Sequence, residues 1–414
     1  MRRKTDSLWR NRSFLAVWSG ETVSEIGGSI GSLTNSWLAY QLTGSEAALG
    51  SMLMTYFLPS LLVQLAAGPY LDRWNRRRVM ICSQWARGAA FLLPLLMLSL
   101  GRLEIWHLHL VSLINGLIQP FYVPSSLAFL PTIVPKEQLP SANAAMDGTV
   151  RLMMVVGPPL GGLALAACGT GATIGAVCIA YLASGAFLLV CEDDTADKAD
   201  AKESWVRQFT AGMRYFRRQR VLLWLGIFLS FVQFAVGAAM VLNPAYVTDD
   251  LHGDSFQYGL FVAGYPCGYA LGSLLIGRTR ELRRCRWIML GSLFFGGLTF
   301  IALAGIHHIG LAILTEVVAG VAAPFFHVHS TSLYQRMVPS ELLGRVLSVR
   351  LLIIRTAMPL GILLSGFWAE SWGVRPIYAV IGFVICLTSL AGILLPWFSF
   401  LEEQQENCEN FVQM

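Results

Sequence analysis

The sequence predicts an all-α integral membrane protein, and three observations lead to this prediction. Of the 414 residues, 55% are hydrophobic and only 13% are charged, whereas charged residues make up about a quarter of a typical soluble domain. The apolar residues fall in blocks of about 20, the length that an α-helix needs to cross a bilayer. Clusters of basic residues separate these blocks, among them four arginines within 73–78. Because arginine is costly in hydrocarbon, the clusters mark aqueous loops.

Twelve apolar stretches are long enough to be transmembrane helices, and a polar segment divides them into two sets of six. The first set covers 14–40, 47–69, 79–100, 105–132, 144–167 and 172–191, and the second covers 221–246, 256–277, 287–304, 309–335, 346–369 and 375–399. The predicted domains are an N-terminal six-helix bundle (1–191), a cytoplasmic linker (192–220), a C-terminal six-helix bundle (221–401) and a cytoplasmic tail (402–414).

Positive charge alternates from one predicted loop to the next. Basic residues gather in the segments 2–12, 73–78, 198–220, 278–286 and 336–350, whereas the turns between them carry little or no positive charge. By the positive-inside rule, both termini are expected in the cytoplasm. In the linker, a helical stripe with arginines beside it consists of Trp205, Phe209, Met213 and Phe216. This amphipathic helix suits either an anionic membrane surface or docking against the bundle.

The two sets of helices resemble each other in sequence. Val134-Pro135-Lys136-Glu137 precedes a helix that contains Pro158, and Val338-Pro339-Ser340-Glu341, 204 residues later, precedes a helix that contains Pro359. A weak parallel duplication of this kind predicts two similar bundles with a binding site near the membrane midplane.

Several classes of function find no support in the sequence. The eight cysteines are scattered and show no metal-ligand spacing, so we expect no metal site. No nucleotide-binding loop or nucleophile triad is present, which argues against ATP-driven transport and hydrolysis. Because hydrophobic spans separate the basic clusters, we expect no nucleic-acid partner. We also expect no cofactor.

Acidic residues inside the predicted spans are candidates for proton coupling, because each is costly in hydrocarbon. Glu21 and Glu25 lie one helical turn apart on the first helix, so their side chains share a face. Glu25 is about 12 residues into its span, close to the middle of the membrane at ~1.5 Å per residue. Glu316 lies on the span 309–335. For Glu21 and Glu25, pairing of a carboxylate with a nearby arginine for structural reasons is the alternative.

Other polar residues inside the spans are candidates for contacts with a substrate. They are Asn115 and Gln119 on the span 105–132, His327 and His329 on the span 309–335, and Arg355 on the span 346–369. The two histidines are two residues apart and point in different directions, so together they do not predict a metal site.

Three further basic and acidic residues inside the spans have structural explanations. Asp147 and Arg151 are four residues apart and predict a local ion pair. We expect Arg87, on the third helix, either to extend its side chain towards the membrane surface or to pack structurally.

The loop 68–78 reads Gly-Pro-Tyr-Leu-Asp-Arg-Trp-Asn-Arg-Arg-Arg, and it resembles the loop between helices two and three of major facilitator transporters. The resemblance implies a conformational-gating motif made of Gly68, Asp72, Arg73, Arg76 and Arg77. Such charged side chains can form hydrogen bonds with the carbonyl groups at facing helix ends. The family pattern usually has a second glycine after the Asp-Arg pair, and this chain has Asn75 there.

A second motif contains Gly157, Pro158, Gly161 and Gly162, and it is similar to the Gly-Pro-x-x-Gly-Gly motif on helix five of drug:proton antiporters. A packing kink with the same composition is the alternative. The phrases at 42–45, 141–143 and 344–346 look like the macrolide- and siderophore-exporter branch of that family. One departure is that the span 105–132 lacks the buried arginine found in many drug antiporters, so a proton relay through that arginine cannot be carried over.

The resemblance implies a major facilitator fold with twelve transmembrane helices in two six-helix bundles. It further implies a monomer in a bacterial inner membrane that exports an amphipathic small molecule, such as an antibiotic, siderophore or secondary metabolite, in exchange for protons, with a role in drug resistance. Proton-coupled uptake of a metabolite on the same fold is the alternative, and a non-transporting membrane enzyme or sensor is a remote one.

Overall fold

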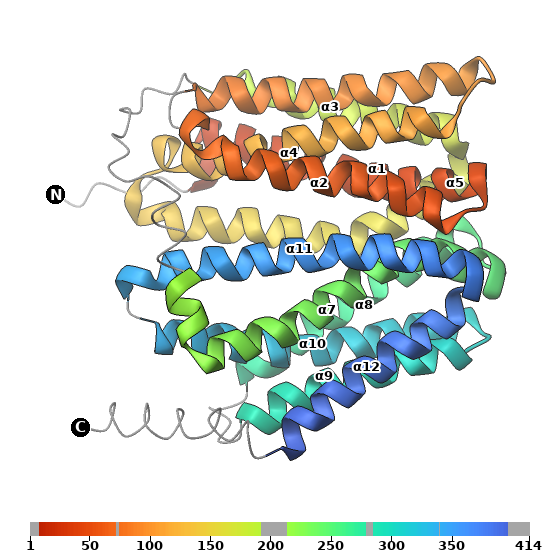
Figure 1. Cartoon of the computed structure of the whole chain (residues 1–414). Coiled ribbons are helices and arrows are strands. Elements are labelled where there is room, and N and C mark those ends of the chain that lie inside the picture. Colours follow the sequence, from red (N-terminus) through yellow and green to blue (C-terminus); the bar gives the residue numbers. More distant parts are fainter. Residues whose placement is uncertain (1–7, 72–73, 192–212, 279–284, 339, 396–414) are drawn as a thin grey trace. The chain divides into compact units, whose positions relative to one another are not determined.

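The computed structural model describes residues 8–71, 74–191, 213–278, 285–338 and 340–395. These residues form long helices (Figure 1). The helices are α1 (Arg12–Thr43), α2 (Glu46–Leu71), α3 (Arg76–Ser99), α4 (Ile105–Ile133), α5 (Leu139–Leu188), α7 (Arg220–Ala245), α8 (Ser255–Arg278), α9 (Cys285–Gly305), α10 (Ile309–Met337), α11 (Ser340–Trp372) and α12 (Val374–Leu394). Single turns form at η1 (Leu8–Arg10), η2 (Lys136–Gln138) and η3 (Tyr246–Asp250).

The prediction of an all-α membrane protein is confirmed. Within the described residues, nine helices are long and apolar enough to cross a membrane. Across the described ranges of the chain, each apolar stretch that the sequence predicts coincides with a helical segment of the structure.

Helix α5 contains two helical arms. With 50 residues it would measure about 75 Å, far more than the ~30 Å of a hydrocarbon core. At Gly169 the backbone leaves the helical region, with φ 77° and ψ 170°, a conformation that is essentially restricted to glycine. The break falls between the predicted spans 144–167 and 172–191, so the arms correspond to those two spans.

The chain divides into two compact units by its internal contacts. Unit 1 comprises Met1–Ala201 together with Asp254–Ala263, and unit 2 comprises Lys202–Gly253 together with Gly264–Met414. The first turns of α8 therefore belong with the N-terminal helices.

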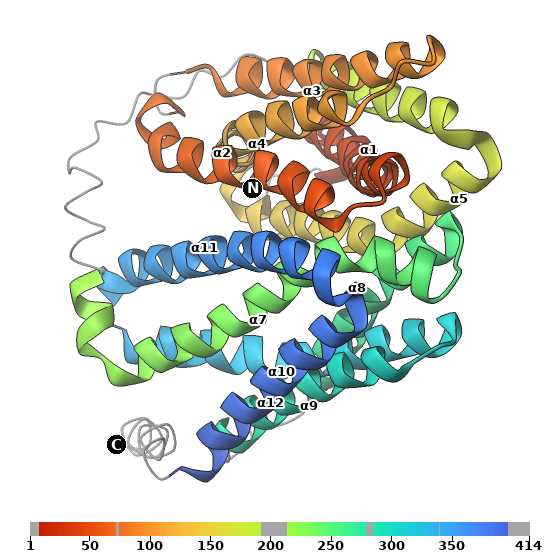
Figure 2. The same cartoon turned by 45° about the vertical axis from the view of Figure 1, so that its right-hand side comes forward.

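In unit 1, α1 packs along α5, α2 packs along α4, and α3 packs against both α4 and α5. The side-by-side course of α3 and α4 is visible in two views (Figures 1 and 2). The core at one end of these helices contains Val17, Met80, Phe129 and Leu188. Glycine allows close approach of the backbones, since a β-carbon on Gly116 of α4 would overlap the backbone of Tyr56 on α2.

In unit 2, α7 packs along α11, and α9 packs along both α10 and α12 (Figure 2). Arg286, in the first turn of α9, is buried. Its guanidinium donates hydrogen bonds to the carbonyl oxygens of Gly392, Ile393 and Leu395, at distances of 3.1, 2.7 and 2.8 Å. These contacts satisfy carbonyl groups at the end of α12 that have no partner within their own helix.

The last part of the linker docks against unit 2. Phe216 is 2% exposed and packs with Leu222 and Leu225, and the hydroxyl of Tyr215 donates to the carbonyl oxygen of Met337 at 3.2 Å. Of the two predictions for the amphipathic stripe, docking is therefore confirmed for Met213 and Phe216. The other two members of the stripe, at 205 and 209, lie outside the described residues.

Candidate functional site

Unit 1 holds a group of polar side chains deep between its helices. We call it the polar cluster, and it consists of Glu21 and Glu25 on α1, Gln84 and Arg87 on α3, Asn115, Gln119 and Tyr122 on α4, and Tyr181 on the second arm of α5. Four of these residues, Glu21, Glu25, Asn115 and Gln119, are predicted site residues, and the fold brings them together.

The position of the two acids along α1 follows from how that helix begins. Asn11 precedes the helix, and its Oδ1 accepts a hydrogen bond from the backbone N–H of Phe14 at 3.1 Å. The side-chain Nδ2 of Asn11 donates to the carbonyl oxygen of Ile133 at 2.7 Å, which ties the start of α1 to the end of α4. From this anchor, Glu21 and Glu25 are about three turns into the helix.

Glu21 is held by a tyrosine. Its side chain is buried, and Oε2 accepts a hydrogen bond of 2.5 Å from the hydroxyl of Tyr122, which is also buried. One turn later on α1, the hydroxyl of Ser24 accepts a hydrogen bond of 2.7 Å from Nε2 of Gln84. A short hydrogen bond to a carboxylate is among the stronger contacts a protein makes, so Glu21 has a fixed partner.

Arg87 is the cation of the polar cluster. Its Nε donates to Oδ1 of Asn115 at 2.8 Å, and its Nη2 donates to the hydroxyl of Tyr181 at 2.7 Å. The guanidinium also lies 4.4 Å from the centroid of the Tyr181 ring, within the range of cation–π attraction. We expected Arg87 to extend towards the membrane surface or to pack structurally, and the first expectation is wrong because two inward-facing partners hold the side chain.

A glycine lets this cation approach the acids. A β-carbon on Gly28 of α1 would lie 3.1 Å from the Tyr181 hydroxyl and 3.7 Å from Nη2 of Arg87. Gly28 is three residues beyond Glu25 and shares its helix face. The charge of Arg87 acts electrostatically on both Glu21 and Glu25. Glu25 makes no hydrogen bond within the described part of the chain, so the two acids differ in their surroundings.

Gln119 adds an unsatisfied acceptor to the polar cluster. It lies on the same face of α4 as Asn115 and Tyr122, at spacings of four and three residues. Its Oε1 is buried and accepts no hydrogen bond from the residues that the structure describes. The polar cluster thus combines a fixed carboxylate, a carboxylate that can gain a partner, a cation and an acceptor. This arrangement is suited to taking up and releasing a proton.

The remaining acid candidate, Glu316, lies on α10 in unit 2. Its side chain is half-buried, and among described residues no hydrogen bond to it is found. It acts electrostatically on Tyr246 and Tyr265. The neighbouring Gly264 makes room for it, since a β-carbon there would lie 2.9 Å from Cβ of Glu316.

The histidine and arginine candidates of unit 2 have different environments. Nδ1 of His329 is 2.7 Å from the carbonyl oxygen of Phe325 on its own helix, whereas His327 is exposed. In the described part of the chain, no group of histidine, cysteine and acidic side chains is arranged to hold a metal ion. The side chain of Arg355 lies outside the described residues.

The predicted gating motif is described in part. Gly68 lies in the last turn of α2, and the residues at 72 and 73 lie outside the described part. Arg77 donates to the carbonyl oxygens of Leu188 and Leu189 at 3.1 and 2.6 Å, and Arg76 donates to the carbonyl oxygen of Ala128 at 3.3 Å. The expected hydrogen bonds to helix-end carbonyls are therefore present for Arg77, whereas Arg76 reaches a carbonyl inside α4. The gating role of both arginines stays a prediction.

The antiporter-like motif lies at a crowded helix junction. Backbone angles remain helical through Pro158, so the helix continues without a break there. Gly157 faces Ser29 of α1, and a β-carbon on Gly161 would lie 3.2 Å from Cα of Ile30. The carbonyl oxygen of Gly162 accepts a hydrogen bond of 3.2 Å from the hydroxyl of Ser255. The glycines therefore serve close packing, and the antiport role of the motif stays a prediction.

The ion pair predicted on the first arm of α5 is confirmed. Nε of Arg151 lies 2.7 Å from Oδ2 of Asp147, and both side chains are 64% exposed. An exposed pair of this kind contributes little to stability.

Sequence reasoning missed four members of the polar cluster: Gln84, Arg87, Tyr122 and Tyr181. The spacing of polar residues in the sequence could have indicated most of them. Gln84 and Arg87 are three residues apart on one helix, and Asn115, Gln119 and Tyr122 follow a four-plus-three spacing on the next. Both spacings place polar groups on one helix face, and two polar faces on neighbouring spans predict a shared polar interior.

Comparisons with known proteins agree with this architecture. The family model described as transmembrane secretion effector matches residues 6–413. Macrolide efflux protein A of Streptococcus pyogenes is 25% identical over 382 residues, which cover 90% of this chain and 94% of the relative. Multidrug efflux pump Tap of Mycolicibacterium fortuitum is 26% identical over 374 residues, which cover 87% of this chain and 90% of the relative.

Solved structures show the same fold. The crystal structure of a bacterial homologue of the iron transporter ferroportin, in an inward-facing state, aligns with a TM-score of 0.73 and 16% identity. The alignment covers 93% of this chain and 99% of that one. With a family model that matches nearly the whole chain and helices that follow a transporter fold, this multi-pass membrane transporter belongs to the transmembrane secretion effector family of the major facilitator superfamily.

Proposed function

We propose that the protein exports an amphipathic small molecule, such as an antibiotic, a siderophore or a secondary metabolite, in exchange for protons. The relatives named as macrolide and multidrug efflux proteins support export. The observation that carries the proton coupling is the polar cluster, in which Glu25 has no hydrogen-bond partner within the described residues and lies close enough to Arg87 for the two to interact electrostatically.

In the proposed mechanism, Glu25 carries the proton. When Glu25 is protonated, Arg87 remains bound to Asn115 and Tyr181, as in the structure. When Glu25 loses its proton, its negative charge attracts the guanidinium, and the hydrogen bonds of Arg87 rearrange. A change of this kind at a mid-membrane site biases an alternating-access equilibrium because protonation stabilises one arrangement relative to the other. Glu21, fixed by Tyr122, keeps the local geometry.

Both units supply further residues to the proposed mechanism. Glu316 is a further candidate for proton coupling, and Asn115, Gln119, His327, His329 and Arg355 are proposed contacts for the substrate. Asp72, Arg73, Arg76 and Arg77, with Gly68, form the proposed gating motif. The proposed antiport motif is Gly157, Pro158, Gly161 and Gly162.

The proposed architecture has twelve spans in two six-helix bundles. Helix α5 is one of the nine candidate spans. Each of its two arms is proposed to cross the membrane once, which makes ten. Helices α1 and α11, with 32 and 33 residues, are long enough to cross and complete the twelve. The proposed domains are 1–191, the linker 192–220, 221–401 and the tail 402–414. We place a monomer in a bacterial inner membrane with both termini in the cytoplasm, driven by the proton gradient without a cofactor.

The direction of transport and the coupling are tested together in inverted membrane vesicles energised to an acidic interior. Addition of a transported macrolide or siderophore should release protons from the vesicle lumen while the compound accumulates inside. Proton-coupled uptake predicts instead that the compound leaves the vesicle lumen together with protons. That result would replace the proposal of export. Vesicles that carry Glu25→Gln provide the negative control, and Glu370→Gln, which changes an exposed acid of α11, provides the matched positive control.

A further inference from the structure

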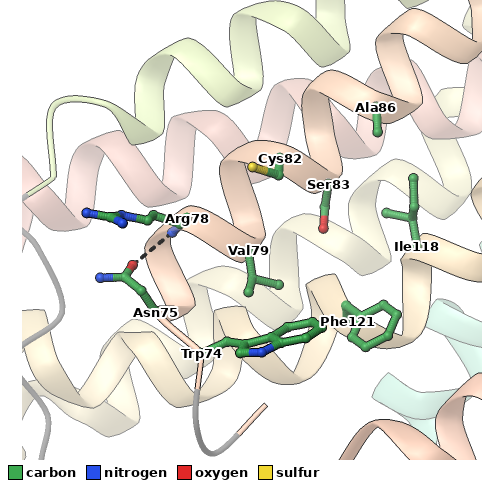
Figure 3. Close-up of a pocket in the computed structure, with 9 residues that line it drawn as sticks. All are labelled: Trp74, Asn75, Arg78, Val79, Cys82, Ser83, Ala86, Ile118 and Phe121. Atoms are coloured by element: carbon green, nitrogen blue, oxygen red, sulfur yellow. Dashed lines mark hydrogen bonds between the residues drawn. The ribbon is translucent and has the colours of Figure 1, made fainter. Parts of the chain in front are cut away.

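A groove of about 600 Å³ lies on the surface of unit 1, between the first half of α3 and α4 (Figure 3). Arg78 and Cys82 of α3 and Ile118 and Phe121 of α4 line it, and Trp74, which precedes α3, lies beside Phe121. The side chains of Trp74, Arg78 and Cys82 are exposed. No lining residue belongs to the polar cluster, so the groove is separate from the candidate functional site.

One end of the groove carries an available positive charge. The backbone N–H of Arg78 donates to Oδ1 of Asn75 at 2.9 Å, which fixes this residue in the first turn of α3. Its guanidinium has neither a hydrogen bond nor an ion pair in the part of the chain that the structure describes, in contrast to Arg76 and Arg77, which bind carbonyl oxygens. None of the lining residues is acidic. A cation at the first turn of a span lies at the depth of the lipid headgroups.

The rest of the groove is apolar and leads away from that charge. Trp74 packs against Phe121 with ring centroids 5.8 Å apart, and tryptophan prefers the membrane–water interface. Val79, Cys82 and Ala86 follow at spacings of three and four residues, so they form one wall along α3. This wall extends about 10 Å along the helix axis. The groove therefore joins a cationic end at headgroup depth to an apolar channel in the hydrocarbon region.

We propose that this groove binds one phospholipid with a net negative headgroup. The phosphate contacts the Arg78 guanidinium, the glycerol region lies beside Trp74, and one acyl chain follows Val79, Cys82 and Ala86. Charge decides between the amphipathic molecules available at this depth, because Arg78 attracts an anionic headgroup and repels a cationic drug. Basic pockets between membrane helices bind anionic headgroups for the same physical reason.

Native mass spectrometry of the full-length protein, purified in detergent, tests the proposal with phosphatidylglycerol and phosphatidylcholine as probes. We expect tighter binding of phosphatidylglycerol. Arg78→Gln should weaken phosphatidylglycerol binding about fivefold, because it removes one cation near the surface. It should weaken phosphatidylcholine binding by a smaller factor, because the choline group compensates the charge of the phosphate. Cys82→Leu, which narrows the apolar channel, should weaken the binding of both lipids.

The matched control is Arg102→Gln, which removes an exposed arginine just beyond the other end of α3 and should leave both affinities unchanged. Equal phosphatidylglycerol affinities for the wild type and Arg78→Gln, with both proteins monodisperse, would overturn the proposal. Displacement of the lipid by millimolar inorganic phosphate would identify a plain anion site, and competitive displacement by tetraphenylphosphonium would identify a drug site. Either result also overturns it. Because no gradient or substrate is used, the outcome is independent of the proposed export function.

Discussion

Arg77 and Arg286 make corresponding contacts in the two halves of the chain. Each lies in the first turn of a helix, α3 or α9, and donates to backbone carbonyl oxygens at the end of another helical arm. The acceptors Leu188 and Gly392 are 204 residues apart, the same separation as between Pro135 and Pro339. The duplication that the sequence indicates therefore extends to individual hydrogen bonds, although the linked arginines differ by a few residues in register.

Loss of either arginine should destabilise the protein. Arg77→Gln and Arg286→Gln each leave helix-end carbonyl oxygens without a donor, which costs about 1–3 kcal/mol where the groups are buried. We expect the larger loss at Arg286, which is buried, while Arg77 lies closer to the surface. Thermal unfolding in detergent measures the effect, with Arg102→Gln as the control. An unchanged melting temperature for Arg286→Gln would show that water replaces the arginine.

Glu25→Gln should abolish proton-driven export while the protein remains folded in the membrane. An amide at this position cannot take up and release a proton, although it occupies nearly the same volume. Transport into inverted vesicles under an imposed pH gradient is the measurement, and surface expression is checked in parallel. Export at the wild-type rate would remove Glu25 from the mechanism and leave Glu316 as the candidate.

Glu21→Gln should have a milder effect on transport, because Glu21 has a fixed partner. The amide oxygen can still accept the hydrogen bond from Tyr122, so we expect at least half of the wild-type export rate. Tyr122→Phe removes the donor and leaves a buried carboxyl group unsatisfied, at a cost of about 1–3 kcal/mol. The melting temperature should therefore fall in Tyr122→Phe and not in Glu21→Gln. If Glu21→Gln is as inactive as Glu25→Gln, the two acids share one function.

Arg87 should tolerate no simple replacement. Arg87→Gln removes the charge that acts on both acids, and we expect export to fall more than tenfold. Arg87→Lys keeps the charge, but an ammonium group cannot reproduce the planar fork that reaches Asn115 and Tyr181 together, so an intermediate rate is expected. Comparison of the transport rates of these two variants in vesicles separates the effect of the positive charge at position 87 from the effect of the guanidinium geometry. Equal rates for the glutamine variant and the wild type would reduce Arg87 to a packing role.

Gly169 and Gly373 should be equally intolerant of a side chain. Both have a φ of 77°, with ψ values of 170° and 169°, at the turn between two helical segments. Gly169→Ala and Gly373→Ala should each cost about 1–3 kcal/mol, because this backbone region is essentially restricted to glycine. The matched control is Gly148→Ala, within the first arm of α5, where a β-carbon meets nothing within 4 Å and alanine favours the helix. Melting temperatures should fall for the first two variants and hold or rise for the third.

The helices could be predicted from the sequence because span length and loop charge are local properties. The break at Gly169 was expected from the uncharged turn between two apolar stretches, and both acids on α1 were found from their cost in hydrocarbon. The partners of those acids depend on how each helix is rotated about its axis. Apolar residues surround a membrane helix on all sides, so periodicity says little about rotation, and Tyr181 could not be distinguished from a lipid-facing aromatic residue.

The direction of the Arg87 side chain could not be predicted from the sequence either. Its charge was visible in the sequence, but the side chain of a lone arginine on a membrane helix has many possible directions. Only the packing of α3 against α4 and α5 decides that the guanidinium meets Asn115 and Tyr181. The buried arginine that many drug antiporters carry on helix four is absent here, yet helix three supplies a cation to the Asn115 side chain of helix four.

The guanidinium of Arg87 can lie close to α1 because residue 28 of that helix is a glycine. Gly28 carries no β-carbon, and the guanidinium and the Tyr181 hydroxyl occupy the neighbourhood of the missing methyl group. The strength of the attraction between Arg87 and Glu25 can therefore be tuned without a change in either charged residue. A single methyl group at position 28 would act as a spacer, so natural variation there would adjust the pH range in which a transporter of this design operates while its charges stay the same.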